Sequence, residues 1–411
     1  MSEETPAEAS ARPAEAFLLA LGRALHTCGY PSHRLESILG GVAHRLGLEA
    51  QFFSQPTSMF VAFGPQDRQQ TFLVRVEPGD FDLGRLSRLH GLMGDLLAGR
   101  TPLPAATARV QAIMSAPAAF PEWLTLLAFS LASASVARFL GGAGREILAS
   151  ALLGLITGGL AVWSTRGADA ARVFPPLAAF AASVCAELLA HALGGYSVIT
   201  ATLAGLIVLL PGLTLTTAVS ELSQRHLASG TSRLTGAFAQ FLILGFGVAL
   251  GHRLALAVAG PPPAALLLPL PPWTDVVALF VSPLALAVLL RADARDFLPI
   301  VISGVVSYGS ASLGTLLLGP ELGLFLAAFV LVVGSLLYAR HTRRPSVVTT
   351  IPGLIMLVPG SAGFRSVAAL LNSEVMPGVE AAFRVILMAV ALVAGAMAAA
   401  LVLPERELPG P

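Results

Sequence analysis

Long stretches without a charged residue occupy most of the chain after residue 120. A helix that crosses a bilayer needs about 20 mostly apolar residues. Uncharged runs of about this length lie at 147–165, 297–320, 345–364 and 385–404, and residues 188–220 contain only one histidine. Breaks at charges, Gly-Pro clusters and Gly-Gly pairs predict ten spans, approximately at 123–140, 145–164, 173–193, 196–217, 234–257, 273–290, 297–318, 321–339, 346–368 and 381–403.

The first 120 residues have a different pattern. Apolar residues at helical spacing predict helices over 14–28 and 32–46, and again over 82–98 and 103–114. Between these pairs, short segments rich in Phe, Val and Thr are bounded by turn residues and predict antiparallel strands at 51–53, 58–63 and 71–76. The expected order is α-α-β-β-β-α-α, which is that of a small α+β domain.

Composition excludes a soluble globular protein. Of the 411 residues, 55% are hydrophobic and 12% are charged, whereas a water-facing surface needs about 25–35% charged positions. The formal net charge of +1 leaves no basic surface for nucleic acid, so no nucleic-acid partner is expected. We therefore predict a polytopic α-helical membrane protein, with the lipid bilayer as a partner and a small α+β cytoplasmic domain preceding the spans.

The arginines predict the orientation of the spans. With the amino terminus inside, ten arginines of short loops and the tail fall on the cytoplasmic side and five on the external side. The positive-inside rule favours this arrangement. The cytoplasmic group is Arg166, Arg172, Arg225, Arg233, Arg291, Arg295, Arg340, Arg343, Arg344 and Arg406, and the external group is Arg138, Arg145, Arg253, Arg365 and Arg384. Both termini are expected in the cytoplasm.

The membrane part contains an internal repeat. Residues 197–212 align without gaps on residues 345–360, at an offset of 148, with seven identities in 16 positions that include a shared G-L-I-x-L-x-P-G pattern. At an offset of 150, Arg145-Glu146 falls on Arg295-Asp296. Because each copy holds five spans, the second copy must be inverted, as in secondary transporters. The predicted units are 1–120 (soluble domain), 121–260 (first repeat) and 261–411 (second repeat).

Each copy carries a Pro-Gly pair inside a charge-free run, at Pro211-Gly212 and Pro359-Gly360. Proline removes a backbone hydrogen bond, and hydrocarbon does not tolerate unpaired backbone groups. An interrupted helix must therefore line protein or a water-filled cavity, and paired interruptions mark the binding site of a transporter. The alternative is that each Pro-Gly simply ends a span.

Three groups of motifs carry a resemblance to a known family. They are LLPGLTLTTAVSELSQRHLASGTSRL (209–234), GYPSHRLESILGGVAHRLGL with FFSQPTSMFVAFG in the first 120 residues, and AAFVLVVGSLLYARHTRRPSVVTTIPGLIMLVPGSAG (327–363). With these motifs the chain resembles the bacterial threonine/serine exporter family in a fused two-module form, from about residue 14 onward. The resemblance implies an inner-membrane secondary transporter that exports threonine or serine. One departure is Glu221, where the family usually has Asp.

The candidate substrate site surrounds the interruptions. Glu221 could bind a substrate ammonium or a coupling proton, or pair with Arg225 at i+4 on a helix end. The nearby threonine hydroxyls suit a hydroxy amino acid, or cap a helix, and Arg233 could bind a carboxylate or anchor a span. The predicted substrate-binding set is Pro211, Gly212, Thr214, Thr216, Thr217, Glu221, Arg233, Pro359, Gly360 and Ser361.

Other ionisable residues are candidates for proton coupling. Glu187 and His191, four residues apart in one span, share a helix face and could relay protons with Glu221, or else reach the aqueous edge. His33, Arg34 and Glu36 have no nucleophile or metal spacing near them and are interpreted as a solvated helix face.

Proton-coupled export of a small amino acid is thus the expected function. Alternatives are export of another small carboxylate such as a dicarboxylic acid, a membrane-embedded hydrolase, and a non-transporting scaffold with a ligand-sensing domain. The hydrolase lacks a nucleophile or metal constellation. No cofactor and no metal are expected, and the sequence leaves a homo-oligomer open.

Overall fold

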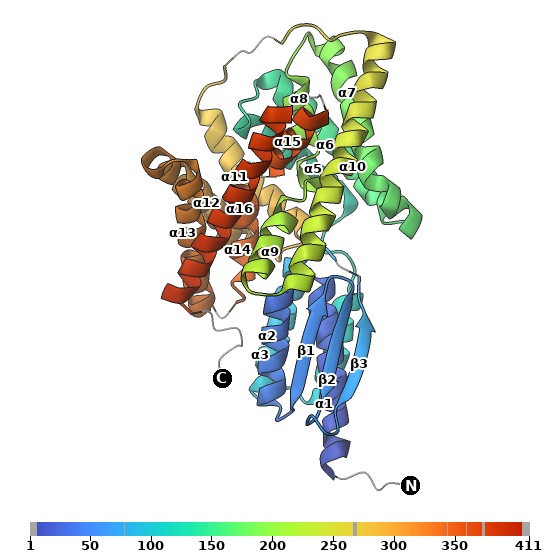
Figure 1. Cartoon of the computed structure of the whole chain (residues 1–411), viewed down its shortest axis with the longest axis vertical. Coiled ribbons are helices and arrows are strands. Elements are labelled where there is room, and N and C mark those ends of the chain that lie inside the picture. The colour runs from blue at the N-terminus through green and yellow to red at the C-terminus, as the bar shows by residue number, and fades with distance from the viewer. Residues whose placement is uncertain are drawn as a thin grey trace.

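The computed structural model describes residues 6–77, 79–265, 269–342, 344–358, 360–371 and 375–404. Figure 1 shows a helical body with a small α+β unit at one end. We call that unit, residues 6–115, the amino-terminal region. Its elements are α1 (Pro6–Thr27), α2 (Ser32–Arg45), β1 (Ala50–Gln55), β2 (Ser58–Phe63), β3 (Gln70–Arg75), α3 (Leu83–Leu97) and α4 (Leu103–Ser115). This is the predicted order of elements.

The strands form one antiparallel sheet in the order β1-β2-β3. Successive side chains of a strand point to opposite faces, and on β2 the buried residues are Met59, Val61 and Phe63. They pack on the apolar faces of the helices, including Phe17 and Leu39. The alternation in the sequence is therefore the reason that this face of the sheet turns inward.

The helical body follows the predicted charge-free ranges. Its elements are α5 (Glu122–Phe139), α6 (Gly144–Ser164), α7 (Ala168–Leu193), α8 (Val198–Gly205), η1 (Ile207–Leu209), α9 (Gly212–Ser223), α10 (Leu227–Ala259), α11 (Trp273–Leu289), η2 (Ala294–Asp296), α12 (Phe297–Leu318), α13 (Pro320–Thr342), α14 (Val347–Leu357), α15 (Gly360–Leu371) and α16 (Val375–Val402). In the described part of the chain, seven helices are long and apolar enough to cross a membrane, or eight if the bent pair α8 and α9 is one span. The chain is a polytopic helical membrane protein, and the count of ten stays a prediction.

Helix α10 illustrates the packing. Every fourth residue along one side, from Phe238 to Leu254, is a large apolar side chain exposed on the surface of the molecule. Lipid is the solvent that such a stripe requires. On another side, Gly247 and Gly251 let the backbone of α7 approach, because an added Cβ would lie 2.8 and 2.7 Å from the carbonyl oxygens of Pro176 and Phe180. Small residues permit such close helix contacts in membranes.

The amino-terminal region rests on one end of the helical body. The backbone N–H of Leu83 donates to the carbonyl of Leu290 at the end of α11 (2.9 Å). Val347 and Ile351 of α14 belong to the same buried apolar cluster as the core of the amino-terminal region. The end of α16 returns to this side too, since Met397 contacts Ser223 at the end of α9.

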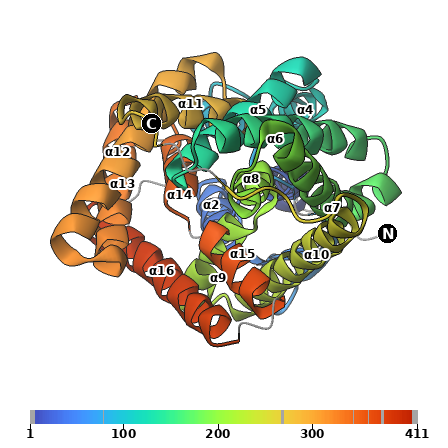
Figure 2. The ribbon, with the colours of Figure 1, turned by 90° about the horizontal axis from the view of Figure 1, so that it is seen from above.

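Two interrupted segments lie in the middle of the body. We call α8, η1 and α9 the first interrupted segment, and α14 with α15 the second. Viewed from above, they lie inside a surrounding group of longer helices (Figure 2). The first ends at the amino-terminal region and the second begins there, so the two segments run in opposite directions.

Candidate functional site

Both interrupted segments have a backbone hydrogen bond of the same kind at the break. In the first, the N–H of Gly212 donates to the carbonyl of Leu210 (2.8 Å), and in the second the N–H of Gly360 donates to that of Val358 (2.9 Å). In the first segment this i to i−2 bond closes a γ-turn centred on Pro211. The helix is interrupted between Leu209 and Gly212, so the interruption predicted at Pro211-Gly212 is confirmed. A bend of 55° lies a little earlier, between α8 and residues 207–223. Pro359 lies outside the described residues.

The two turns meet. A Cβ added at Gly212 would lie 3.0 Å from the Cα of Gly360 and would collide with the Val358 side chain. Only glycine leaves room for this approach of two backbones. The Pro-Gly pairs thus place glycine at the point where the two halves of the body touch.

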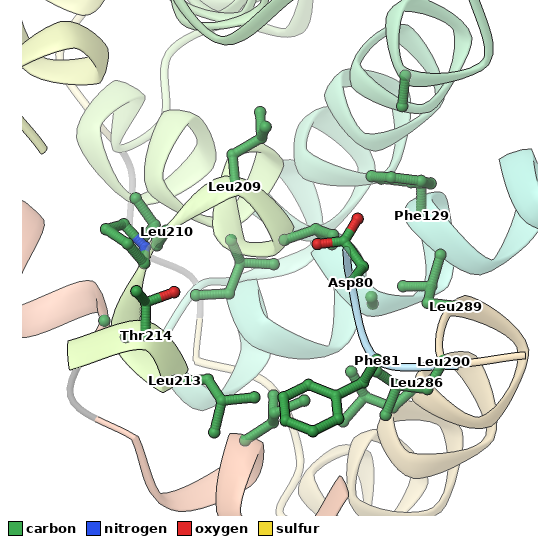
Figure 3. Close-up of a pocket in the computed structure, with 18 of the residues that line it drawn as sticks. Asp80, Phe81, Phe129, Leu209, Leu210, Leu213, Thr214, Leu286, Leu289 and Leu290 are labelled. Carbon is green, nitrogen blue, oxygen red and sulfur yellow. The ribbon is translucent and has the colours of Figure 1, made fainter. Parts of the chain in front are cut away.

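A cavity of about 1000 Å³ surrounds this contact. Among the residues that the sequence predicts for the site, it is lined by Pro211, Gly212, Thr214, Thr217, Arg233, Gly360 and Ser361. Figure 3 shows Leu209, Leu210 and Thr214 on the wall formed by the first interrupted segment. Two remote parts of the sequence therefore share one cavity.

Thr216 and Glu221 do not line this cavity. Thr216 is buried, and its hydroxyl donates to the carbonyl of Gly212 within the same helix (3.2 Å). Glu221 is fully buried, and its Oε2 lies 3.1 Å from Nε of Arg233 in α10. The structure pairs Glu221 with Arg233, another residue of the predicted site, rather than with Arg225.

Glu221 also binds the amino-terminal region. Its Oε1 accepts a hydrogen bond from the backbone N–H of Ser32 at the start of α2 (2.9 Å). The hydroxyl of Ser32 donates to that of Ser229, which donates to the carbonyl of Ser54 (2.9 and 2.7 Å). The carboxylate therefore joins the first interrupted segment, α10 and the amino-terminal region. No local pattern in the sequence indicates this contact, because it forms only where the amino-terminal region docks on the helical body.

The interpretation of His33 and Glu36 as a solvated helix face is wrong. Glu36 accepts a hydrogen bond from the N–H of Ser54 (2.7 Å) and lies 3.6 Å from the ring of His226, at the start of α10. Burial raises the pKa of Glu36. Burial, with the charges of Arg34 and His226, lowers the pKa of His33 to about 3. These residues belong to the interface with α10.

Glu187 has a partner that sequence reasoning missed. Its buried carboxylate lies 2.5 Å from Nδ1 of His252 in α10, whereas His191 contacts the carbonyl of Gly260 (3.3 Å). Glu187 and His191 lie one helical turn apart on α7, as the spacing predicts, but no direct bond joins them in the described structure. A single sequence does not reveal which two spans pack together, so His252 gave no signal.

Two buried acids each contact the chain just before one of the interrupted segments. Glu146, near the start of α6, accepts hydrogen bonds from the N–H groups of Ala143 and Ser197 (3.0 and 2.9 Å). Asp296, its counterpart at the offset of 150, forms an ion pair with Arg344. Ser197 immediately precedes α8, and Arg344 lies three residues before the start of α14, so each acid contacts the chain close to the beginning of one interrupted segment.

The cavity also includes part of the amino-terminal region. Gly79, Asp80 and Phe81, between β3 and α3, line its wall. This loop carries no motif, and sequence reasoning missed it. Within the described residues, no group of three or more His, Cys, Asp or Glu side chains is placed to hold a metal ion.

Comparisons with known proteins agree with this architecture. The family model described as "Putative threonine/serine exporter" matches residues 16–255, and the model described as "Threonine/Serine exporter, ThrE" matches residues 275–402. The pheromone-regulated membrane protein 10 of Eremothecium gossypii is 28% identical over 87% of this chain and 49% of its own length. Its namesake in Saccharomyces cerevisiae is 27% identical over 87% of this chain and 47% of its length.

The chain thus spans about half the length of these curated relatives. They are fungal membrane proteins, so they lend no support to a bacterial source or to a bacterial inner membrane. No solved structure matches the chain.

Proposed function

Since the chain belongs to the threonine/serine exporter family, we propose that it exports threonine, serine or a closely related small amino acid by alternating access, driven by the proton gradient. Its family is one of membrane exporters and not of enzymes. The observation that carries the proposal is the meeting of two interrupted segments at one cavity, since transporters bind their substrates at such breaks.

An inverted repeat of two five-helix units is part of the proposal. Three observations support it: the interrupted segments run in opposite directions, each break has an i to i−2 hydrogen bond, and Glu146 and Asp296 each contact the chain just before one segment. Residues 121–260 and 261–411 would be the two units, with residues 1–120 preceding them. Alternating access would then exchange the conformations of the two halves about the contact between Gly212 and Gly360.

We assign the substrate carboxylate to Arg233 and the substrate hydroxyl to Thr214, Thr217 or Ser361. A guanidinium binds a carboxylate with two parallel hydrogen bonds, and Arg233 reaches the cavity wall while Glu221 holds its Nε. Glu221 then acts as a positioning residue. Direct binding of substrate or of a proton by Glu221 would require its contacts with Arg233 and Ser32 to open.

Proton coupling is assigned to Glu187 together with His252. A carboxylate inside a membrane helix is costly and is usually functional. Glu187 is buried, while the side chain of His252 is about half exposed (47%). The histidine therefore links the buried carboxylate to the surface of the molecule. His191, one turn further along α7, is exposed and would lie on the outer part of the same route.

The distribution of arginines supports a cytoplasmic location for the amino-terminal region and for the end of α16, which lie on the same side of the body. In a bacterial cell the membrane would be the inner membrane. Arg365, which the sequence places near the second interruption, is exposed and does not line the cavity.

Proteoliposomes test the proposal. The purified full chain is reconstituted, and exchange of labelled threonine, serine and a dicarboxylic acid is measured with and without a pH gradient. We expect exchange of threonine and serine above protein-free liposomes, and net movement that follows the proton gradient. Exchange of the dicarboxylic acid alone would favour the alternative that the protein exports another small carboxylate. Exchange of none of the three compounds would contradict transport.

A further inference from the structure

One wall of the cavity comes from outside the helical body. The loop that follows β3 enters the cavity, and the Asp80 carboxylate points between Leu209 of the first interrupted segment and Phe129 of α5 (Figure 3). Leu289 and Leu290 lie close by. Asp80 is exposed to the cavity, in mostly apolar surroundings.

The backbone packs closely against its neighbours on both sides of Asp80. Gly79 lies so close to Thr27 that a Cβ there would collide with the Thr27 carbonyl, and a Cβ on Gly29 would lie 3.2 Å from the Asp80 carbonyl carbon. On the other side, Asp82 caps α3 by accepting the N–H of Arg85 (2.9 Å). A group that is held in place before a ligand arrives loses little entropy when it binds.

The charges of the cavity wall are unevenly paired. Its arginines are Arg233 and Arg291, and each has a carboxylate partner, Glu221 at 3.1 Å and Asp82 at 3.6 Å. The Asp80 carboxylate has no hydrogen bond or ion pair with any residue in the described part of the chain. Among the described residues, Glu122, the other carboxylate of the wall, is likewise unpaired. Asp80 is the one that lies beside the first interrupted segment, where a cationic group can satisfy its negative charge.

We infer that Asp80 binds the ammonium group of the transported amino acid, and that the amino-terminal region thereby determines substrate class. The inference rests on the proposed transport function. The exposed Asp80 carboxylate has no partner among the described residues, and an ammonium donates charge-assisted hydrogen bonds to a carboxylate. A dicarboxylic acid would instead be repelled. Asp80 thus favours amino acids over carboxylic acids of the same size.

The test uses the full chain in proteoliposomes and compares Asp80→Asn with the unaltered protein. Exchange of labelled threonine is measured over a range of concentrations, and 2,3-dihydroxybutanoate, which replaces the amino group by a hydroxyl, serves as a competitor. A hydrogen bond to a charged group contributes about 1.5–3 kcal/mol, so we expect a KM at least about tenfold higher. The maximal rate should change little, and threonine should lose its advantage over the competitor.

Two further variants distinguish a specific role of Asp80 from a general effect of removing a negative charge. Asp67→Asn removes an exposed carboxylate from the β2–β3 turn, far from the cavity lining, and should leave KM unchanged. Glu122→Gln removes the other carboxylate of the cavity wall, and a loss equal to that of Asp80→Asn would overturn a specific role for Asp80.

An unchanged KM and unchanged selectivity in Asp80→Asn would overturn the inference while leaving transport intact. Failure of the unaltered protein to exchange any amino acid would instead overturn the proposed function, and the inference with it.

Discussion

Gly212 and Gly360 lie against each other although 148 positions separate them in the sequence. An added Cβ on Gly212 would be 3.0 Å from the Gly360 Cα, whereas one on Gly360 would find its nearest neighbour, Leu210 Cβ, at 3.4 Å. The contact is therefore asymmetric. A methyl group at position 212 forces the two halves apart, but one at position 360 fits in ordinary van der Waals contact.

This asymmetry predicts different outcomes for two alanine variants. Gly212→Ala should lower stability by about 1–3 kcal/mol, the usual effect of overpacking, and should slow exchange because the halves no longer meet. Gly360→Ala should be close to the unaltered protein. Gly236→Ala is a matched control, because Gly236 lines the cavity with open space around it. Equal behaviour of all three variants in thermal unfolding and exchange would contradict this account.

Cysteine accessibility tests the cavity wall. The sequence suggests Thr216 and Ser361 as exposed positions, but Thr216 is buried and bonded within its own helix. We therefore expect Thr217→Cys and Ser361→Cys to react with a membrane-impermeant thiol reagent and to be protected by substrate. Thr216→Cys should be inert. The background lacks Cys28 and Cys185, and labelling of Thr216→Cys at the rate of the others would show that the described lining is incorrect.

Much of the fold was predictable from local patterns. Charge-free runs located the long helices, alternation located β2, and Pro-Gly pairs located the interruptions. The missed features all join distant segments: Glu221 to Ser32, Glu187 to His252, and Asp80 to the cavity. The spacing of residues within one helix indicates only which of them are neighbours on that helix. Docking of the amino-terminal region on the helical body has no comparable signature in a single sequence.

The interface at His33 predicts a pH dependence of stability. Its pKa is about 3 in the folded protein and 6.5 ordinarily, so between these values the unfolded chain binds a proton that the folded chain does not. Stability should therefore fall as pH decreases below about 6.5. The raised pKa of Glu36 acts oppositely, because its contribution is lost as pH rises.

Thermal unfolding between pH 4 and 7 measures this dependence. His33→Gln should flatten the fall toward acid, while His44→Gln, at an exposed position of α2, should retain it. A profile of His33→Gln that superimposes on that of the unaltered protein would remove His33 from the explanation.

Glu187 and His252 should be needed for coupling more than for binding. His252→Ala leaves the buried Glu187 carboxylate without its partner, so we expect the response to a pH gradient to be lost while exchange of labelled threonine persists. His191→Gln should have a smaller effect, because His191 contacts only a backbone carbonyl among the described residues. Gradient-driven movement at the normal rate in His252→Ala would exclude this pair from coupling.

Variants of the Glu221–Arg233 pair distinguish an effect on protein stability from an effect on transport. Removing one partner of a buried ion pair typically costs about 3–5 kcal/mol, so Glu221→Gln should lower stability as well as exchange, and protein abundance alone is a poor readout. The double variant Glu221→Gln, Arg233→Gln removes both charges and should recover stability. Exchange should stay lost, because no guanidinium remains for the substrate carboxylate.

Two single variants complete this test. Glu221→Asp keeps the charge and should retain measurable exchange, although its carboxylate is one methylene shorter. Arg225→Gln alters the i+4 neighbour with which Glu221 could have paired, and it should match the unaltered protein because Glu221 contacts Arg233 instead. If the double variant recovers both stability and exchange, Arg233 does not bind the substrate, and the pair serves only to fasten the amino-terminal region to the helical body.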